Sequence, residues 1–286
     1  MRAAVVVGGL VALALGLGFA VGGPRVWGGP LAGWVALGAL AVQWVAFVPA
    51  YLAQTERYYD LVGSLTHLSV VSATLGVAWM TGVATLASVL VAAAVGCWAV
   101  RLGTFLFRRV LRAGHDRRFV AIKTSPQRFL VAWTLQGMWV FVTTLAAQVV
   151  IASGGPVSAF TAVGLVLFGV GFAVEVVADR QKSVFRADPA NQERFITTGL
   201  WAWSRHPNYF GEIVLWTGIW VSGLGVYAGG QWLTALSPLF VTFLLTRVSG
   251  IPMLQASAEE RWGDDPAYRA YVERTPLLLP RPPTLR

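Results

Sequence analysis

Eight long runs of apolar residues limit what this chain can fold into. A helix needs about 20 mostly apolar residues to cross the hydrocarbon core of a membrane, and each run is close to that length. None alternates with the period of two that strands of a membrane barrel show. The sequence therefore predicts an all-α fold, a polytopic membrane helical bundle of about 7–8 transmembrane helices that forms a single membrane domain over residues 1–286. The runs are Ala4–Val21, Leu31–Ala53, Leu61–Met80, Val83–Val100, Phe129–Ala152, Ala159–Ala178, Tyr209–Tyr227 and Gln231–Val248.

The charge content supports the same class. Hydrophobic residues make up 56% of the 286 residues and charged residues only 12%, whereas soluble domains carry about 25% charged residues. The net charge of +9 could suggest nucleic acid, but the basic residues lie between apolar runs rather than on one soluble surface, so no nucleic-acid partner is expected. With one cysteine and three scattered histidines, the chain has no intrachain disulfide, and no metal site is predicted.

The positions of lysine and arginine predict the orientation, because cytoplasmic loops are enriched in both. If eight spans start with the N-terminus inside, every one of the 22 basic residues except Arg25 falls on the inside. The outside connections Ser153–Ser158 and Ala228–Gly230 carry no charge. The first run exceeds the usual length of the apolar core of a signal peptide, so we count it as a span. We therefore expect a cytoplasmic C-terminus.

The most polar segment beside an apolar run surrounds Pro207, a residue that suits the first turn of a helix. Asn208 and Glu212, four residues apart, share a face of that helix. Arg205 and His206 would lie at its N-terminus, where free N–H groups favour anions. These residues predict a pocket for a phosphate-bearing ligand. The alternative is a helix cap with interfacial charges that pack against lipid headgroups.

A second polar pair, Glu175 and Asp179, lies at the end of the sixth run and is followed by Arg186. Two like charges on one helix face repel unless a cation or the hydroxyl groups of a ligand lie between them. The pair therefore predicts a ligand contact. The alternative is a solvated helix end with Arg180 and Lys182 as neighbours, and this alternative is favoured for Asp179 considered alone.

Protonatable groups also follow the second run. Glu56, Tyr58 and Tyr59 could act as general acids at the membrane boundary, although the tyrosines equally fit the aromatic belt of a membrane protein. The basic segment Arg101–Arg128 is interpreted first as a cytoplasmic loop attracted to anionic lipid, with polyphosphate binding as the alternative. His67, inside the third run, is expected to be a buried histidine with satisfied hydrogen bonds.

The C-terminal region predicts an amphipathic segment. Tyr268 and Tyr271 are three residues apart, with arginines between and around them. This pattern suits a helix that folds over a cytoplasmic opening, and a surface helix lying on lipid is the alternative.

Several segments together resemble the bacterial uncharacterised branch of the steroid 5-alpha-reductase family. The likeness covers about residues 31–286 and is most specific in the C-terminal third. The resemblance implies a protein of the bacterial inner (cytoplasmic) membrane, a bundle that holds NADPH in a cavity open to the cytoplasm, and a hydride transfer that reduces a carbon–carbon double bond conjugated to a ketone. The segments are Arg57–Thr66, Gly199–Glu212, Arg247–Pro252 and Pro266–Tyr271.

The resemblance also implies cofactor contacts at particular residues. Asn208 and Glu212 match the Asn-x-x-x-Glu motif of that family. Asp179 and Arg186 match its aspartate and arginine seven residues apart, and Glu175 stands where the steroid enzymes have asparagine.

Elsewhere in the chain, Arg101 matches an arginine that follows the fourth span of that family, and Tyr268 matches a tyrosine near its C-terminus. The steroid enzymes polarise the enone oxygen with an adjacent Gln-Glu pair and a tyrosine. Here Gln54 and Glu56 are not adjacent, and Trp98 aligns with the tyrosine. An indole N–H can donate a hydrogen bond but delivers no proton at neutral pH. The resemblance therefore supports cofactor binding more than steroid reduction.

Isoprenylcysteine-type methyltransferases, which bind S-adenosylmethionine, are also similar around Arg205, His206 and Tyr209 and in the tyrosine-containing tail. We accordingly count Arg205, His206 and Tyr209 among the residues expected to bind a cofactor. The sequence predicts an NADPH-dependent reductase of a hydrophobic small molecule, with membrane lipid as its surroundings and Glu56, Tyr58 or Tyr59 as proton donor. A membrane methyltransferase is the alternative enzyme, and a non-catalytic scaffold is the third class.

Overall fold

Helices make up about three quarters of the chain. A computed structural model describes residues 2–114 and 116–283, so His115 lies outside the described residues. Within them the strands are β1 (Arg25–Val26) and β2 (Gly29–Pro30), a short antiparallel hairpin. Seven helical segments of the described chain are long and apolar enough to cross a membrane. The predicted all-α polytopic fold is therefore confirmed, and the chain is a multi-pass helical membrane protein.

The helices follow most of the predicted runs with different ends, and they depart most from the seventh and eighth runs. The long apolar stretch in the first half forms the expected hairpin, α3 (Tyr59–Met80) and α4 (Leu86–Ala113). The predicted span Tyr209–Tyr227 is instead α7 (Pro207–Val221), which begins at Pro207 as predicted but has only 15 residues. At 1.5 Å per residue it is about 22 Å long, which is less than the roughly 30 Å hydrocarbon core.

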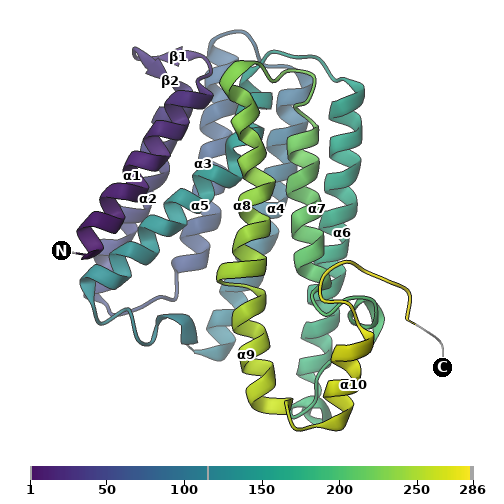
Figure 1. Ribbon diagram of the computed structural model, residues 1–286. Helices are drawn as coiled ribbons and strands as arrows, with labels where there is room; N and C mark the ends of the chain where they lie inside the picture. The colour runs from purple at the N-terminus through teal and green to yellow at the C-terminus, as the bar shows by residue number, and fades with distance from the viewer. Residues whose placement is uncertain (1, 115, 284–286) are drawn as a thin grey trace. The chain divides into compact units, whose positions relative to one another are not determined.

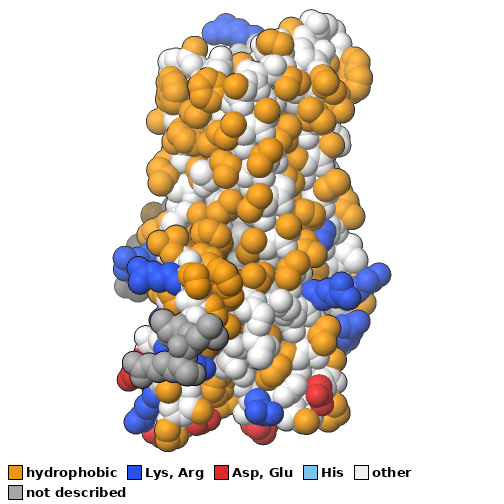
Figure 2. Space-filling model, turned by 90° about the vertical axis from the view of Figure 1, so that its right-hand side faces the viewer, with side chains coloured by type: hydrophobic (Ala, Val, Ile, Leu, Met, Phe, Trp, Pro, Cys, Tyr) orange, Lys and Arg blue, Asp and Glu red, His pale blue; other side chains and the backbone are white. Residues whose placement is uncertain are grey.

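Contacts between Cα atoms divide the chain into two units. Unit 1 comprises Met1–Ala162 and Ile219–Ser237, and unit 2 comprises Val163–Gly218 and Pro238–Arg286. The expectation of a single membrane domain stays a prediction. On the face drawn in Figure 2, apolar side chains fill the upper part, and most of the basic and acidic side chains gather in the lower part.

Unit 1 is organised around α5 (Pro126–Ala152), which contacts each of the first four helices. In α5, 83% of the most apolar stretch is buried, whereas the same measure is 22% for α1 (Arg2–Val21). A helix that is apolar on every side suits this central position. His67 of α3 is satisfied as predicted, because its ring nitrogens lie 2.9 Å from the Gly63 carbonyl oxygen and 3.1 Å from Thr143 Oγ1. The other elements of the unit include α2 (Leu31–Leu52) and the 3-10 turns η1 (Arg117–Phe119) and η4 (Gly229–Ala235).

Unit 2 contains most of α6 and α7 together with the C-terminal helices (Figure 1). The C-terminal tail forms α9 (Ile251–Trp262) and α10 (Pro266–Arg274), and Tyr268 and Tyr271 of α10 are both buried. Asp265 caps α10, since its side chain accepts a hydrogen bond of 2.8 Å from the Ala267 N–H. The elements are α6 (Ala159–Ala187), η2 (Pro189–Asn191), η3 (Gly199–Ala202), α8 (Leu236–Phe243), the π-helical turn η5 (Leu244–Val248), α9 (Ile251–Trp262) and α10 (Pro266–Arg274).

Glycines bring α6 and α7 into backbone contact. A Cβ atom added to Gly211 of α7 would lie 2.6 Å from the Gly171 carbonyl oxygen, and one added to Gly171 would lie 2.5 Å from the Gly211 carbonyl oxygen. One heptad away, Gly218 meets the Gly164 carbonyl in the same manner. Small residues allow membrane helices to approach this closely. The contact fixes which polar side chains of the two helices face each other.

Candidate functional site

The close contact between α6 and α7 joins two of the predicted polar pairs. The Asn208 amide of α7 donates a hydrogen bond of 3.2 Å to Asp179 Oδ1 of α6. Asp179 is 7% exposed and Glu175 is 2% exposed, so both carboxyl groups lie inside unit 2. Glu175 packs beside Gly211, the residue before Glu212. The structure thus brings the predicted pair Glu175 and Asp179 to one helix contact with Asn208 of the other predicted pair, and Glu212 follows on the face of Asn208.

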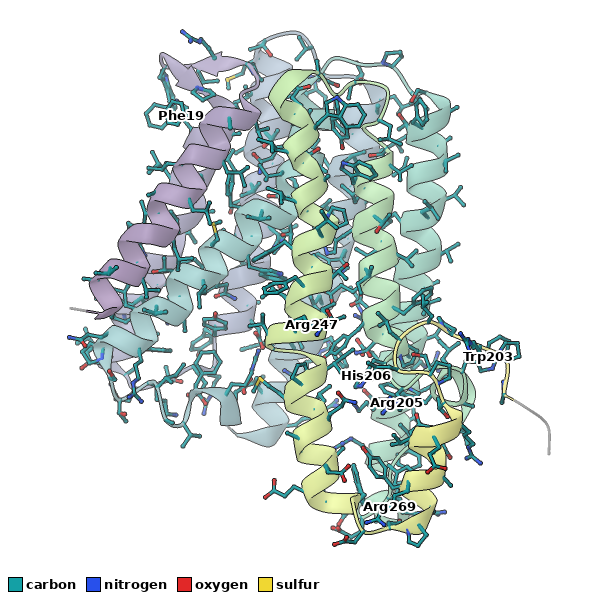
Figure 3. All side chains as sticks on the ribbon, in the orientation of Figure 1. Phe19, Trp203, Arg205, His206, Arg247 and Arg269 are labelled. Carbon is teal, nitrogen blue, oxygen red and sulfur yellow. The ribbon has the colours of Figure 1, made fainter. Side chains whose placement is uncertain are left out.

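The residues before α7 form the second part of the site. Within Arg205-His206, the ring of His206 stacks on Tyr209 at 5.6 Å with an interplanar angle of 7°. Figure 3 shows Arg205 and His206 close together, with Trp203 directed away from them. Nε of Arg205 and Nδ1 of His206 are buried and have no hydrogen-bond partner among the described residues. Buried polar atoms without partners are rare in folded proteins and need an explanation, which a bound ligand would supply.

The charge of His206 differs from the expectation of a basic pair. Burial is the main cause that lowers the pKa of His206 to about 3, and the nearby positive charges of Lys182 and Arg205 contribute to this value in the same direction. The imidazole is therefore neutral at pH 7. Only Arg205 of the pair attracts an anion by charge, and His206 contributes hydrogen bonding and stacking.

A C-terminal strap holds this segment in place. We give that name to Thr275–Arg281, which runs antiparallel to residues 203–205. The N–H of Arg205 donates to the Pro276 carbonyl at 2.9 Å, and the N–H of Arg281 donates to the Trp203 carbonyl at 3.0 Å. Between them, the Ser204 hydroxyl donates to the Leu278 carbonyl at 2.9 Å and accepts from the His206 N–H at 3.2 Å.

An arginine pocket of about 290 Å³ lies at the end of α6. Arg186, Arg194 and Arg261 line it, and Glu193 is the one acidic residue among its lining residues. Glu193 lies 3.6 Å from Arg261, so the pocket retains an excess of positive charge. Trp262 closes one side, and its indole N–H donates to the Glu193 carbonyl at 2.9 Å.

Of these pocket residues, only Arg186 was expected from the sequence. Arg194 and Arg261 lie on separate elements, and only the folded chain places them around one volume.

The predicted residue Tyr268 belongs to an aromatic cluster behind this pocket. Its ring lies 5.2 Å from that of Phe195 and 6.1 Å from that of Trp262. Tyr271, three residues on, anchors the cluster by donating a hydrogen bond of 2.8 Å to the Trp201 carbonyl. Burial raises the pKa of both tyrosines. A contact between Tyr268 and a cofactor stays a prediction.

The residues expected to donate a proton lie in unit 1. Glu56 is 5% exposed and accepts hydrogen bonds from Lys123 Nζ at 2.7 Å and from the Asp116 N–H at 2.9 Å. Burial raises its pKa, but the hydrogen bonds from Lys123 and Asp116 outweigh burial and the net pKa lies below its ordinary value. Glu56 is therefore ionised at neutral pH and has no proton to give.

The two tyrosines beside Glu56 differ from each other. The Tyr59 hydroxyl donates to the Ala132 carbonyl at 2.8 Å, whereas Tyr58 is half exposed and stacks on Phe107. Arg101, also in unit 1, lies over the ring of Phe105 at 5.1 Å. A contact between Arg101 and a cofactor stays a prediction. Among residues 2–114 and 116–283, no group of three His, Cys, Asp or Glu side chains could hold a metal ion.

The fold and this site define a multi-pass helical membrane protein with a buried polar helix contact and an arginine-lined pocket. The chain belongs to the family described as "Protein of unknown function (DUF1295)", whose model matches residues 46–275. That family is related to steroid 5-alpha-reductase-like membrane proteins, which supports the resemblance at the level of the family.

One curated protein is similar over a shorter stretch. The probable O-methyltransferase ustE of Ustilaginoidea virens is 36% identical over 72 residues. The match covers 25% of this chain and 24% of that protein, so the chain spans about a quarter of its relative. No solved structure matches the chain.

Proposed function

We propose that this protein is an integral membrane NADPH-dependent reductase that reduces the carbon–carbon double bond of a hydrophobic, steroid- or lipid-like enone. The observation that carries the proposal is the arginine pocket, where Arg186, Arg194 and Arg261 surround one volume with a single acidic neighbour. NADPH carries a pyrophosphate and a 2′-phosphate, and the planar fork of arginine suits phosphate oxygens. The chemistry of the lining residues therefore fits this cofactor.

The site has two other parts, the Arg205-His206 segment and the contact between α6 and α7. Both offer polar groups that suit the rest of a dinucleotide. Nε of Arg205 and Nδ1 of His206 are buried polar atoms without protein partners in the described chain. Asn208, held by Asp179, offers an amide, and Glu212 on the same helix face offers a carboxylate that accepts hydrogen bonds from hydroxyl or amide groups. When bound, NADPH would supply a hydride.

Reduction of an enone also needs a proton, which ends on the second carbon or on the oxygen. Of the three expected donors, Glu56 is ionised and paired with Lys123. Tyr58 and Tyr59 each carry a phenol proton, and we assign the donor role to this pair. Tyr58 is half exposed and Tyr59 is more enclosed, so Tyr59 is the better shielded from water of the two.

A membrane methyltransferase that uses S-adenosylmethionine is the second candidate. The similarity to a probable O-methyltransferase favours it, and so does the buried acidic pair Glu175 and Asp179, since carboxylates suit a sulfonium cation. The three pocket arginines count against it, because S-adenosylmethionine has no phosphate.

We further propose that the protein lies in a bacterial cytoplasmic membrane with its C-terminus in the cytoplasm. The support is the distribution of lysine and arginine, all but one of which fall on the inside in the predicted topology. A reporter inserted between Ala113 and Gly114 should be cytoplasmic, and one at Gly154 should be exported. Export of a C-terminal reporter would reverse the proposed orientation.

Ligand binding to detergent-solubilised protein separates the two enzyme classes. We expect NADPH to bind, with an affinity that falls as ionic strength rises, because partly exposed charge pairs are screened. NADH should bind more weakly if the arginine pocket holds the 2′-phosphate. Binding of S-adenosylmethionine without NADPH would overturn the reductase proposal in favour of the methyltransferase.

The variant Glu212→Gln tests the polar face of α7. It keeps the shape and removes the charge, so NADPH affinity should fall roughly ten- to a hundredfold, as expected for loss of a charged hydrogen-bond partner. Glu260→Gln, an exposed change on α9, is the matched control and should leave affinity unchanged. A folded Glu212→Gln variant that binds NADPH as tightly as the parent would assign Glu212 a structural role.

A further inference from the structure

The C-terminal turns of α4 carry a basic face that the proposed reaction does not use. α4 has 28 residues, which gives a length of about 42 Å. The hydrocarbon core of a membrane is roughly 30 Å thick, so the helix is long enough to carry its last turns into the headgroup region. These turns contain Arg108, Arg109 and Arg112.

Acidic residues neutralise one side of this region. Arg109 lies 3.8 Å from Asp60, and Arg118 lies 3.2 Å from Asp60 and 2.7 Å from Asp116. Lys123 is likewise paired with Glu56 at 2.7 Å. These basic residues hold the loop after α4 against the start of α3, and their charge is matched locally.

The other side keeps its charge. Arg108 and Arg112 are four residues apart on one helix face, and both are exposed. The stack of Tyr58 on Phe107 brings the turn that carries Arg57 alongside this end of α4. No ion pair within residues 2–114 and 116–283 involves Arg57, Arg108 or Arg112.

Exposed apolar side chains lie among these arginines. Leu111 is 50% exposed beside Arg112, Tyr58 is 50% exposed beside Arg57, and Val100, two turns before Arg108 on α4, is 55% exposed. A site for a soluble anion has no need of exposed apolar neighbours. A phospholipid contacts basic and apolar side chains together, because its acyl chains lie against the apolar helix face and its phosphate lies at the level of the arginine guanidinium groups.

We propose that this face, defined by Arg57, Arg108 and Arg112 with Tyr58 and Leu111, binds the phosphate headgroup of an anionic phospholipid. Arginine binds phosphate oxygens through two parallel hydrogen bonds, and each basic residue near an anionic membrane strengthens binding roughly fivefold. The three arginines of this face belong to neither the arginine pocket nor the α6–α7 contact, and Tyr58 is the one residue that the face shares with the proposed donor pair.

The test uses the full chain in nanodiscs that contain phosphatidylcholine and phosphatidylglycerol in equal amounts. Lipids that stay with the protein after mild detergent extraction are counted by native mass spectrometry. The parent should retain phosphatidylglycerol in preference to phosphatidylcholine. In the double variant R108Q/R112Q, the ratio of retained phosphatidylglycerol to phosphatidylcholine should fall at least tenfold. The variant R108K/R112K keeps the charge and should retain most of the parent's preference.

Arg109→Gln is the matched control, because it removes an arginine from the same turn whose charge Asp60 already neutralises. It should retain phosphatidylglycerol within twofold of the parent. The proposal fails if the parent retains both lipids equally, or if R108Q/R112Q and Arg109→Gln lose the lipid to the same extent. It also fails if inorganic pyrophosphate displaces phosphatidylglycerol from the parent, because the face would then be a site for soluble anions.

Discussion

Two clusters of charged residues, one in each unit, use the same residue types in opposite proportions. In unit 1 three basic residues, Lys123, Arg109 and Arg118, face three acidic ones, Glu56, Asp60 and Asp116. In unit 2 the arginine pocket has three arginines and one glutamate. Matched charges hold a loop against a helix end, whereas an excess of one sign favours a counter-charge from outside the chain. The comparison separates residues that maintain the fold from residues that fit a ligand.

Removing one partner from the matched cluster should have the largest effect on stability. Lys123→Ala leaves the carboxylate of Glu56 buried without its cation, and breaking a buried ion pair typically costs about 3 kcal/mol of unfolding free energy. Denaturant unfolding in detergent micelles measures the loss. Lys123→Arg keeps the charge and is the control. A Lys123→Ala variant as stable as this control would show that the ion pair does not hold the loop.

Removing one arginine from the pocket should change binding rather than stability. Arg194→Gln or Arg186→Gln should weaken NADPH affinity roughly ten- to a hundredfold, the loss expected for one charged hydrogen-bond partner of a phosphate. The unfolding free energy should change little, because these side chains are exposed in the free protein. Equilibrium titration at two ionic strengths measures the effect.

Arg269→Gln is the matched control for the pocket variants. Arg269 is an exposed arginine of α10 that pairs with Asp264 at 3.2 Å and does not line the pocket. Its replacement should leave NADPH affinity unchanged. Equal losses in Arg269→Gln and Arg194→Gln would attribute the effect to net charge, and the distinction between matched and unmatched clusters would disappear.

The sequence predicted the helices better than their ends. Composition identifies an apolar run because each residue contributes locally, and the runs became helices nearly everywhere. Composition could not show that α7 stops at Val221, since the following residues, Ser222–Tyr227, carry no charge that would end a membrane span. The stop depends on a tight turn in which Gly223 packs against the ring of Tyr227.

The candidate site was predicted in parts. Asn208 and Asp179 came from separate motifs, and their hydrogen bond required the glycine contact between α6 and α7. The ionised state of Glu56 could not be inferred, because it depends on Lys123, a residue that is distant in the sequence. Local spacing carries information about one helix face, and only tertiary packing decides which faces meet.

The low pKa of the buried His206 in unit 2 can be tested by changing the pH. Its pKa of about 3 in the folded chain lies below the ordinary value of 6.5. Between these values the unfolded chain binds a proton that the folded chain does not. The unfolding free energy should therefore fall by up to about 1.4 kcal/mol per pH unit as the pH drops from 6.5 toward 3.

The variant His206→Asn isolates this contribution from the other titrating groups. Its unfolding free energy, measured over the same pH range, should lack the part of the slope that His206 supplies. NADPH affinity of the parent should also show no rise as the pH falls through 6.5, because the imidazole stays neutral. A rise in affinity there would mean that His206 becomes cationic and attracts phosphate directly.

The smallest expected effect concerns Ser204, which links the C-terminal strap to the start of α7. Ser204 is fully buried, and its hydroxyl serves both the Leu278 carbonyl and the His206 N–H. Ser204→Ala leaves both backbone groups without this partner and should lower the unfolding free energy by about 1 kcal/mol. Unit 2 relies here on neutral hydrogen bonds, so this loss should be the same at low and high salt, unlike the loss in Lys123→Ala.

Ser183→Ala is the matched control, since the exposed Ser183 bonds only within its own helix, to the Asp179 carbonyl at 2.7 Å. If the strap positions Arg205 and His206, Ser204→Ala should also weaken NADPH binding several-fold, and truncation after Thr275 should add little to that loss, because both changes release the same segment. Additive losses would mean that Ser204 and the strap act independently. Unchanged affinity in the folded Ser204→Ala variant would restrict the strap to a stabilising role and leave the arginine pocket as the main contact for the cofactor.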